Sequence, residues 1–221
     1  MCCTGAAFSV RLILVNDLEK LKNRLSQIKL IAIEVDGVLT DGRVWQAADG
    51  QFRRVFSIRD AMGIRLLKKS GYRVVFFSFE ASEDISRHAM ALGVDLFVAG
   101  DFPGTQFAQN PKSQAAVDLR FAEPNGHPNI SVHSLVEEMR SRFKVQSEEI
   151  LSFLSAGTTG NTSIGIWPKE VLKCSVAKSN SQELHFCCRG DAGEGVVREL
   201  SQILLKFRKT ENDTARTTAS L

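Results

Sequence analysis

Short apolar runs alternate with amphipathic segments along most of the chain. Segment 29–35 (Lys-Leu-Ile-Ala-Ile-Glu-Val) is almost continuously apolar, as is typical of a strand buried on both faces of a parallel sheet. Similar runs at 72–77, 94–98 and 150–154 predict three more strands. Because these strands alternate with helical segments, the pattern predicts an α/β fold built on a doubly wound parallel sheet.

Between the runs, apolar residues recur at helical spacing. The predicted helices cover 16–27, 59–70, 83–92, 132–143 and 195–206. In the second of them, Met62, Ile64, Leu66 and Leu67 are expected on the packing face. Gly71 follows this helix and is a typical helix stop.

Three parts of the chain are predicted by composition. Residues 1–28 form an N-terminal segment and helix, and 29–208 form the α/β domain. Within it, about 101–130 holds four of the five prolines and is interpreted as an insertion or long surface loop. The polar segment 209–221 is predicted to be a disordered tail.

A β-hairpin is predicted within 43–55. Asp49-Gly50 is a strong turn signal and lies between a strand that contains Trp45 and a strand that contains Phe52. An isolated two-stranded ribbon is marginally stable in water, so it should either pack on its own domain or project into an interface.

Composition excludes several classes of partner. The net charge is only +3 with 24% charged residues, which points to neither a nucleic acid nor an anionic membrane as partner. No stretch approaches the about 20 apolar residues of a membrane helix, and no secretory leader is evident. The five cysteines and four histidines lack metal-ligand spacing. We therefore expect buried free thiols and a cytoplasmic protein.

Two acidic residues are the first candidates for chemistry. Glu34 and Asp36 stand at the carboxyl end of the first predicted strand, where ligands bind in open parallel sheets. Spacing alone leaves open whether they are functional or only cap the following turn.

The sequence around them is similar to that of a known family. Ile-Glu-Val-Asp-Gly-Val-Leu-Thr-Asp-Gly at 33–42, Phe-Ser-Ile-Arg-Asp-Ala-Met-Gly-Ile at 56–64 and Gly-Glu-Gly-Val-Val-Arg-Glu at 193–199 resemble motifs of the haloacid dehalogenase superfamily. The resemblance is to sugar-acid phosphatases that act on 3-deoxy-D-manno-octulosonate 8-phosphate, and to the C-terminal domain of some acylneuraminate cytidylyltransferases. It covers about 29–207 apart from the insertion.

The resemblance implies roles for particular residues. Glu34 takes the position of the nucleophile that attacks phosphorus, Asp36 that of the acid/base, and Ser78 that of a phosphate-binding hydroxyl. Mg²⁺ would be held by the side chain of Glu34, by Asp36 and by an acidic loop after the fourth strand, since a hard cation prefers oxygen ligands.

Several positions depart from the family pattern. Glu34 is one methylene longer than aspartate, Val132 replaces the phosphate-binding lysine, and Glu194 replaces an arginine. In the acidic loop, three carboxylates have become Thr158, Thr159 and Thr162. Lys112, inside the insertion, is a candidate substitute for the lost lysine.

These departures favour a phosphatase homologue that has lost hydrolysis and binds no cofactor. It would serve as an oligomeric scaffold, a regulator or a binder of a small anionic sugar. The alternative is an active, Mg²⁺-dependent phosphatase on a sugar-acid phosphate that uses Glu34 and Asp36. A third possibility is another small-ligand activity in the same crevice. The resemblance also implies a homotetramer, with Trp45 and Phe52 at its interface.

Overall fold

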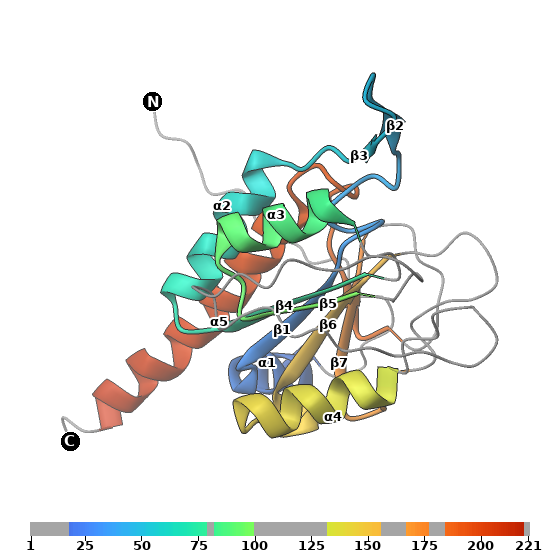
Figure 1. The fold of residues 1–221 in the computed structure, drawn as a ribbon. Coiled ribbons are helices and arrows are strands. Elements are labelled where there is room, and N and C mark those ends of the chain that lie inside the picture. Colours follow the sequence, from blue (N-terminus) through green and yellow to red (C-terminus); the bar gives the residue numbers. More distant parts are fainter. Residues whose placement is uncertain (1–17, 79–81, 100–131, 156–166, 177–183, 219–221) are drawn as a thin grey trace, which may run out of the picture.

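A parallel sheet of six strands forms the centre of the protein (Figure 1). The computed structural model describes residues 18–78, 82–99, 132–155, 167–176 and 184–218, with side chains up to 208. In spatial order the strands are β5 (Leu96–Ala99), β4 (Arg73–Ser78), β1 (Leu30–Glu34), β6 (Ile150–Leu154), β7 (Leu172–Ser175) and β8 (Phe186–Cys187). The α/β fold with a doubly wound parallel sheet is therefore confirmed.

Helices cover both faces of this sheet (Figure 1). They are α1 (Leu18–Gln27), α2 (Ile58–Lys69), α3 (Glu83–Leu92), α4 (Val132–Phe143) and α5 (Val196–Thr218), with a short 3₁₀ turn, η1 (Ser147–Glu149). One core cluster joins α1, α2, α3 and α5 to one face, and a second joins α4 to the other.

Alternate side chains of β1 enter the two clusters, which explains its unbroken apolar sequence. Ile31 and Ile33 pack in the first cluster, whereas Leu30 and Ala32 pack in the second. All four are fully buried. Because both faces of such a strand are buried, its sequence does not alternate between apolar and polar residues.

Two strands escaped prediction, although both are buried. β7 pairs in parallel with β6, and β8 pairs in parallel with β7. Lys173 and Ser175 interrupt the apolar pattern of β7, and β8 has only two residues. Both features hide a buried strand from a search for apolar runs.

The last helix is longer than predicted. α5 runs to Thr218, so most of segment 209–221, which we expected to be a disordered tail, continues the helix. This segment contains neither glycine nor proline, so nothing in it stops a helix that has already formed.

α2 and α5 pack closely because α2 carries a glycine at their contact. A Cβ on Gly63 would lie 2.7 Å from the Cα of Arg198, so no larger residue fits without displacing a backbone. Ile64 and Leu67 are buried here as predicted, but Met62 is 52% exposed and was wrongly placed on the packing face. Gly63 takes the buried position instead.

The predicted hairpin is present and projects from the domain (Figure 1). β2 (Trp45–Gln46) and β3 (Phe52–Arg53) are antiparallel, and Gly50 in the turn has φ +79°. Trp45 and Phe52 are 53% and 60% exposed, so they do not pack on their own domain.

Some expectations concern residues outside the described ranges. These are the insertion at about 101–130 with Lys112, the three threonines of the loop after β6, and Cys2 and Cys3. The other three cysteines, Cys174, Cys187 and Cys188, are buried free thiols, as expected. Among the described helices, none is both long and apolar enough to cross a membrane.

Candidate functional site

The strand order predicts a ligand-binding crevice at the carboxyl end of β1. From β1 the chain proceeds to β4 and β5 on one side, then to β6, β7 and β8 on the other. The crevice at such a reversal is where ligands bind in open α/β sheets. Glu34 ends β1 and Ser78 ends β4, so both lie at this edge, as the sequence indicated.

A tight turn after β1 positions Asp36. The carbonyl oxygen of Val35 accepts hydrogen bonds from the N–H groups of Leu39 at 2.9 Å and Thr40 at 3.2 Å. Gly37 has φ +87°, and a Cβ there would lie 2.6 Å from the Cβ of Ser155. Only glycine can adopt this conformation so close to the end of β6.

Glu34 is a buried carboxylate with a fixed position. The residue lies at the edge of the core and is only 6% exposed to solvent. Its Oε2 accepts a hydrogen bond from the N–H of Ser155 at 2.7 Å. A hydrogen bond of this length holds the carboxyl group in place. Glu34 therefore faces the end of β6 rather than solvent.

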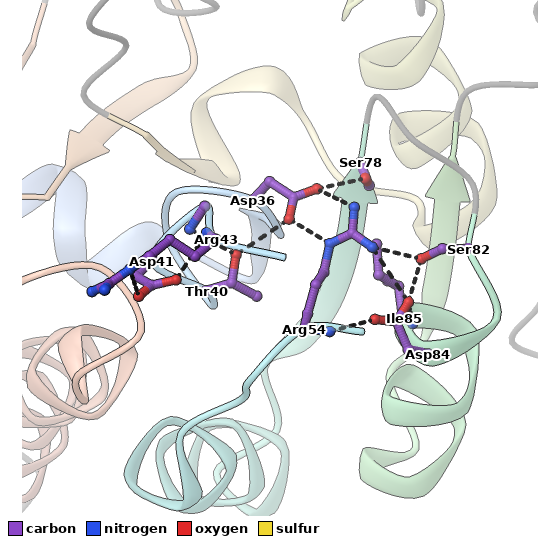
Figure 2. Close-up of polar contacts among 10 residues, drawn as sticks. Asp36, Thr40, Asp41, Arg43, Arg54, Ser78, Ser82, Asp84 and Ile85 are labelled. Atoms are coloured by element: carbon purple, nitrogen blue, oxygen red, sulfur yellow. Dashed lines mark hydrogen bonds and ion pairs between the residues drawn. The ribbon is translucent and has the colours of Figure 1, made fainter. Parts of the chain in front are cut away.

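Asp36 is bound by an arginine that sequence analysis did not single out (Figure 2). Arg54 donates from Nε to Asp36 Oδ1 at 2.7 Å and from Nη2 to Oδ2 at 3.3 Å. Thr40 Oγ1 also donates to Oδ1 at 3.2 Å, and Ser78 Oγ to Oδ2 at 3.4 Å. The structure thus brings Asp36 and Ser78 into contact and adds a bidentate guanidinium.

Arg54 is itself held by the first turn of α3 (Figure 2). Its Nη1 donates to Ser82 Oγ at 3.0 Å and lies 3.4 Å from Asp84 Oδ1, and its backbone N–H donates to Asp84 Oδ2 at 2.9 Å. The side chain is only 2% exposed. No pattern in the sequence distinguishes Arg54 from its neighbour Arg53.

A second buried carboxylate, Asp60 of α2, serves the fold rather than the site. Its Oδ1 accepts the N–H groups of Val197 at 2.7 Å and Arg198 at 3.3 Å, and its Oδ2 that of Gly195 at 3.0 Å. Burial raises the pKa of Asp60, and the three N–H groups act in the opposite direction. Asp60 therefore caps the N-terminus of α5 from a neighbouring helix.

Two histidines have partners away from the crevice, as expected of structural side chains. His88 stacks on Phe56 with ring centroids 3.9 Å apart, and burial lowers its pKa. His185 Nε2 lies 2.7 Å from Arg24 Nη1, and its Nδ1 accepts the N–H of Lys173 at 3.1 Å. Burial, with Arg24 and Lys173 nearby, lowers the pKa of His185 to about 4.

The described residues do not by themselves form a magnesium site. Among them, no three His, Cys, Asp or Glu side chains come together in a way that could hold a metal ion. Glu34 and Asp36 are the carboxylates at the end of β1, and Arg54 binds both oxygens of Asp36. Glu194 is exposed.

The fold is that of haloacid-dehalogenase-type phosphatases, as solved structures show. The 3-deoxy-D-manno-octulosonate 8-phosphate phosphatase from Yersinia pestis superposes with a TM-score of 0.66 and 19% identity, over 91% of this chain and 95% of that one. The same kind of enzyme from Moraxella catarrhalis, solved in complex with a magnesium ion, a phosphate ion and a KDO molecule, gives 0.62 and 18%, over 91% and 99%.

Sequence comparison gives the more particular relationship. A 3-deoxy-D-manno-octulosonate 8-phosphate phosphatase of Haemophilus influenzae is 35% identical over 80 residues, which is 36% of this chain and 44% of that protein. N-acylneuraminate cytidylyltransferase A of Danio rerio is 22% identical over 193 residues, 85% and 37% of the two chains. The chain thus spans less than half the length of these curated relatives. No protein-family model matches it.

The chain therefore has the fold of haloacid-dehalogenase-type phosphatases, and part of its sequence is similar to theirs. Its relatives include the 3-deoxy-D-manno-octulosonate 8-phosphate phosphatases, and it is also similar to N-acylneuraminate cytidylyltransferases. The resemblance read from the motifs is confirmed.

Proposed function

We propose that the protein is a phosphohydrolase that acts on a small phosphorylated sugar acid. The observation that carries this proposal is the grouping of Glu34, Asp36 and the hydroxyl of Ser78 at the carboxyl end of β1, where the strand order reverses. Similarity to sugar-acid phosphatases supports this active function better than the loss of activity that the departures from the motifs suggested.

The side chains have complementary tasks in such a reaction. The N–H of Ser155 holds the Glu34 carboxyl group in place, and Glu34 either attacks phosphorus or activates a water molecule. Asp36 exchanges a proton with the leaving oxygen and the attacking water. Ser78 donates a hydrogen bond to a phosphoryl oxygen. The longer side chain of Glu34 is the main handicap, because a displaced nucleophile can cost on the order of 10²-fold in rate.

Phosphate release from 3-deoxy-D-manno-octulosonate 8-phosphate and from a general phosphomonoester tests the proposal. The assay is run with and without Mg²⁺, because the Moraxella catarrhalis enzyme was solved with a magnesium ion whereas the described residues of this chain do not by themselves form a site for one. We expect Glu34→Gln and Asp36→Asn each to lower kcat by at least about 10²-fold. Glu83→Gln removes an exposed carboxylate that pairs with Arg87 and is the matched control. No release from any of these substrates would refute the proposal.

A second candidate is a non-catalytic domain that retains the fold and the assembly. It is favoured by the bidentate hold of Arg54 on Asp36, which keeps the acid/base residue away from a substrate. Its support also includes the similarity to N-acylneuraminate cytidylyltransferase A, which covers most of this chain. Ligand binding without turnover would establish this second function.

We also propose that the hairpin contacts further copies of the chain, as in a tetramer. Large apolar side chains are exposed along the hairpin and the start of α2: Val44, Trp45, Phe52, Val55, Ile58 and Met62. All six lie within 44–62, and burial of their side chains in an interface would be favourable. A cytoplasmic location stays a prediction.

A further inference from the structure

Hydrogen-bond donors converge on the Asp36 carboxylate in an arrangement suited to a phosphoryl group. Arg54 supplies Nε and Nη2, and Thr40 and Ser78 supply hydroxyls, at 2.7 to 3.4 Å. Two of these donors, Arg54 Nη2 and Ser78 Oγ, share a single oxygen, Oδ2 (Figure 2). A planar guanidinium fork with nearby hydroxyls is a common phosphate-binding set in proteins.

The two partners of this ion pair differ in their freedom to move. The Arg54 side chain is 2% exposed, and Ser82 and Asp84 hold it from the side opposite Asp36. The Asp36 side chain is 36% exposed and is attached to the turn after β1. If the pair separates, Asp36 can therefore rotate toward solvent, whereas Arg54 stays in place.

Charge favours binding of a phosphoryl group beside Arg54. Without Arg54, Glu34 and Asp36 would repel a phosphomonoester dianion, and the position of the family's lysine holds Val132. Arg54 places a buried positive charge beside Asp36. In this surrounding a charge-assisted hydrogen bond is stronger than in water.

We propose that Arg54 is the phosphate-binding cation of this site, and that Asp36 occupies the phosphate position when no ligand is bound. The inference rests on the proposed function, since it names the group that recognises the phosphoryl end of the substrate. Phosphoryl oxygens take the donors of Arg54 and Ser78, and the displaced Asp36 becomes available as acid/base. No covalent bond changes in this exchange.

Titration calorimetry with inorganic phosphate tests the proposal on the full chain. Removing the competing carboxylate in Asp36→Ala should tighten phosphate binding roughly 10-fold or more, because the donors no longer have an internal acceptor. Arg54→Gln should weaken it roughly 10- to 100-fold, and Arg54→Lys should recover part of that loss. Arg87→Gln removes an exposed arginine of α3 and is the matched control, with unchanged affinity expected.

Two outcomes would overturn the proposal. If Arg54 only positions Asp36, then Asp36→Ala leaves phosphate affinity unchanged or lowers it, and the proposal is wrong. Because this variant keeps Arg54, the test stands even if Arg54→Gln does not fold. Absence of phosphate binding in both the unmodified protein and Asp36→Ala would also overturn it.

Binding and turnover separate the two proposals. Phosphate binding that depends on Arg54, without hydrolysis of any substrate, refutes the phosphohydrolase function and supports the phosphate site. Hydrolysis with the same KM in Arg54→Gln as in the unmodified protein supports the function and refutes the role of Arg54.

Discussion

Replacing Asp60 should destabilise the contact between α2 and α5 by an amount that depends on the replacement. In Asp60→Asn the amide oxygen can keep the N–H groups of Val197 and Arg198, which both bind Oδ1. The amide nitrogen then takes the place of Oδ2 and faces the buried N–H of Gly195, donor against donor. One unsatisfied buried N–H costs about 1–3 kcal/mol. Asp60→Ala removes both acceptor oxygens and with them all three hydrogen bonds, and we expect a loss of about 3–5 kcal/mol.

Urea unfolding followed by circular dichroism measures these losses. With a slope of about 2 kcal/mol/M, Asp60→Asn should lower the midpoint by roughly 0.5–1.5 M and Asp60→Ala by more. Protein concentration is kept equal, because assembly shifts apparent stability. Asp41→Asn is the control, since this partly exposed aspartate pairs with the exposed Arg43. A midpoint for Asp60→Asn equal to that of the unmodified protein would show that Asp60 does not cap α5.

Three further predictions concern assembly, metal and pH. Light scattering should give a mass near four times 24.4 kDa, and Trp45→Ser with Phe52→Ser should reduce it without loss of helix signal; a monomer at micromolar concentration would contradict this. Millimolar Mg²⁺ should hardly change the Tm of the unmodified protein. Replacing the three threonines within 157–162 by aspartate, together with Glu34→Asp, should give a Tm that rises with Mg²⁺ concentration until it saturates. A saturable rise of the Tm in the unmodified protein would refute this expectation. Because the pKa of His185 is lowered in the folded protein, the unfolded chain takes up the proton first as the pH falls. The free energy of unfolding should therefore decrease between pH 6.5 and 4 by about 1–2 kcal/mol after solvent screening. An equal pH dependence of stability in His185→Gln would assign the effect to other groups.

Most of the fold was predictable because its strands and helices have clear periodicity. β1 and β6 are short apolar runs covered on both faces, and α3 keeps the bounds that its pattern predicted, 83–92. β7 was missed because Lys173 is buried within it, at 3% exposure. A local apolar pattern cannot show that tertiary structure will enclose a charged side chain.

The site was predictable only where chain order fixes it. Glu34 and Ser78 end parallel neighbouring strands, so their proximity follows from the fold class. Arg54 reaches the same edge from the segment between the hairpin and α2, and its contact with Asp84 spans 30 residues. No periodicity predicts which of two adjacent arginines turns inward, since that depends on how the segment after β3 crosses α3.

The anchoring of Arg54 also separates the hairpin mechanically from the crevice. Arg54 follows directly after β3, which ends at Arg53. Its backbone N–H donates to Asp84, and its guanidinium donates to Asp36. Bending of the ribbon about this fixed point displaces its tip but not the ionic cluster behind it. We therefore expect substitutions at the tip of the hairpin to leave the geometry around Asp36 unchanged.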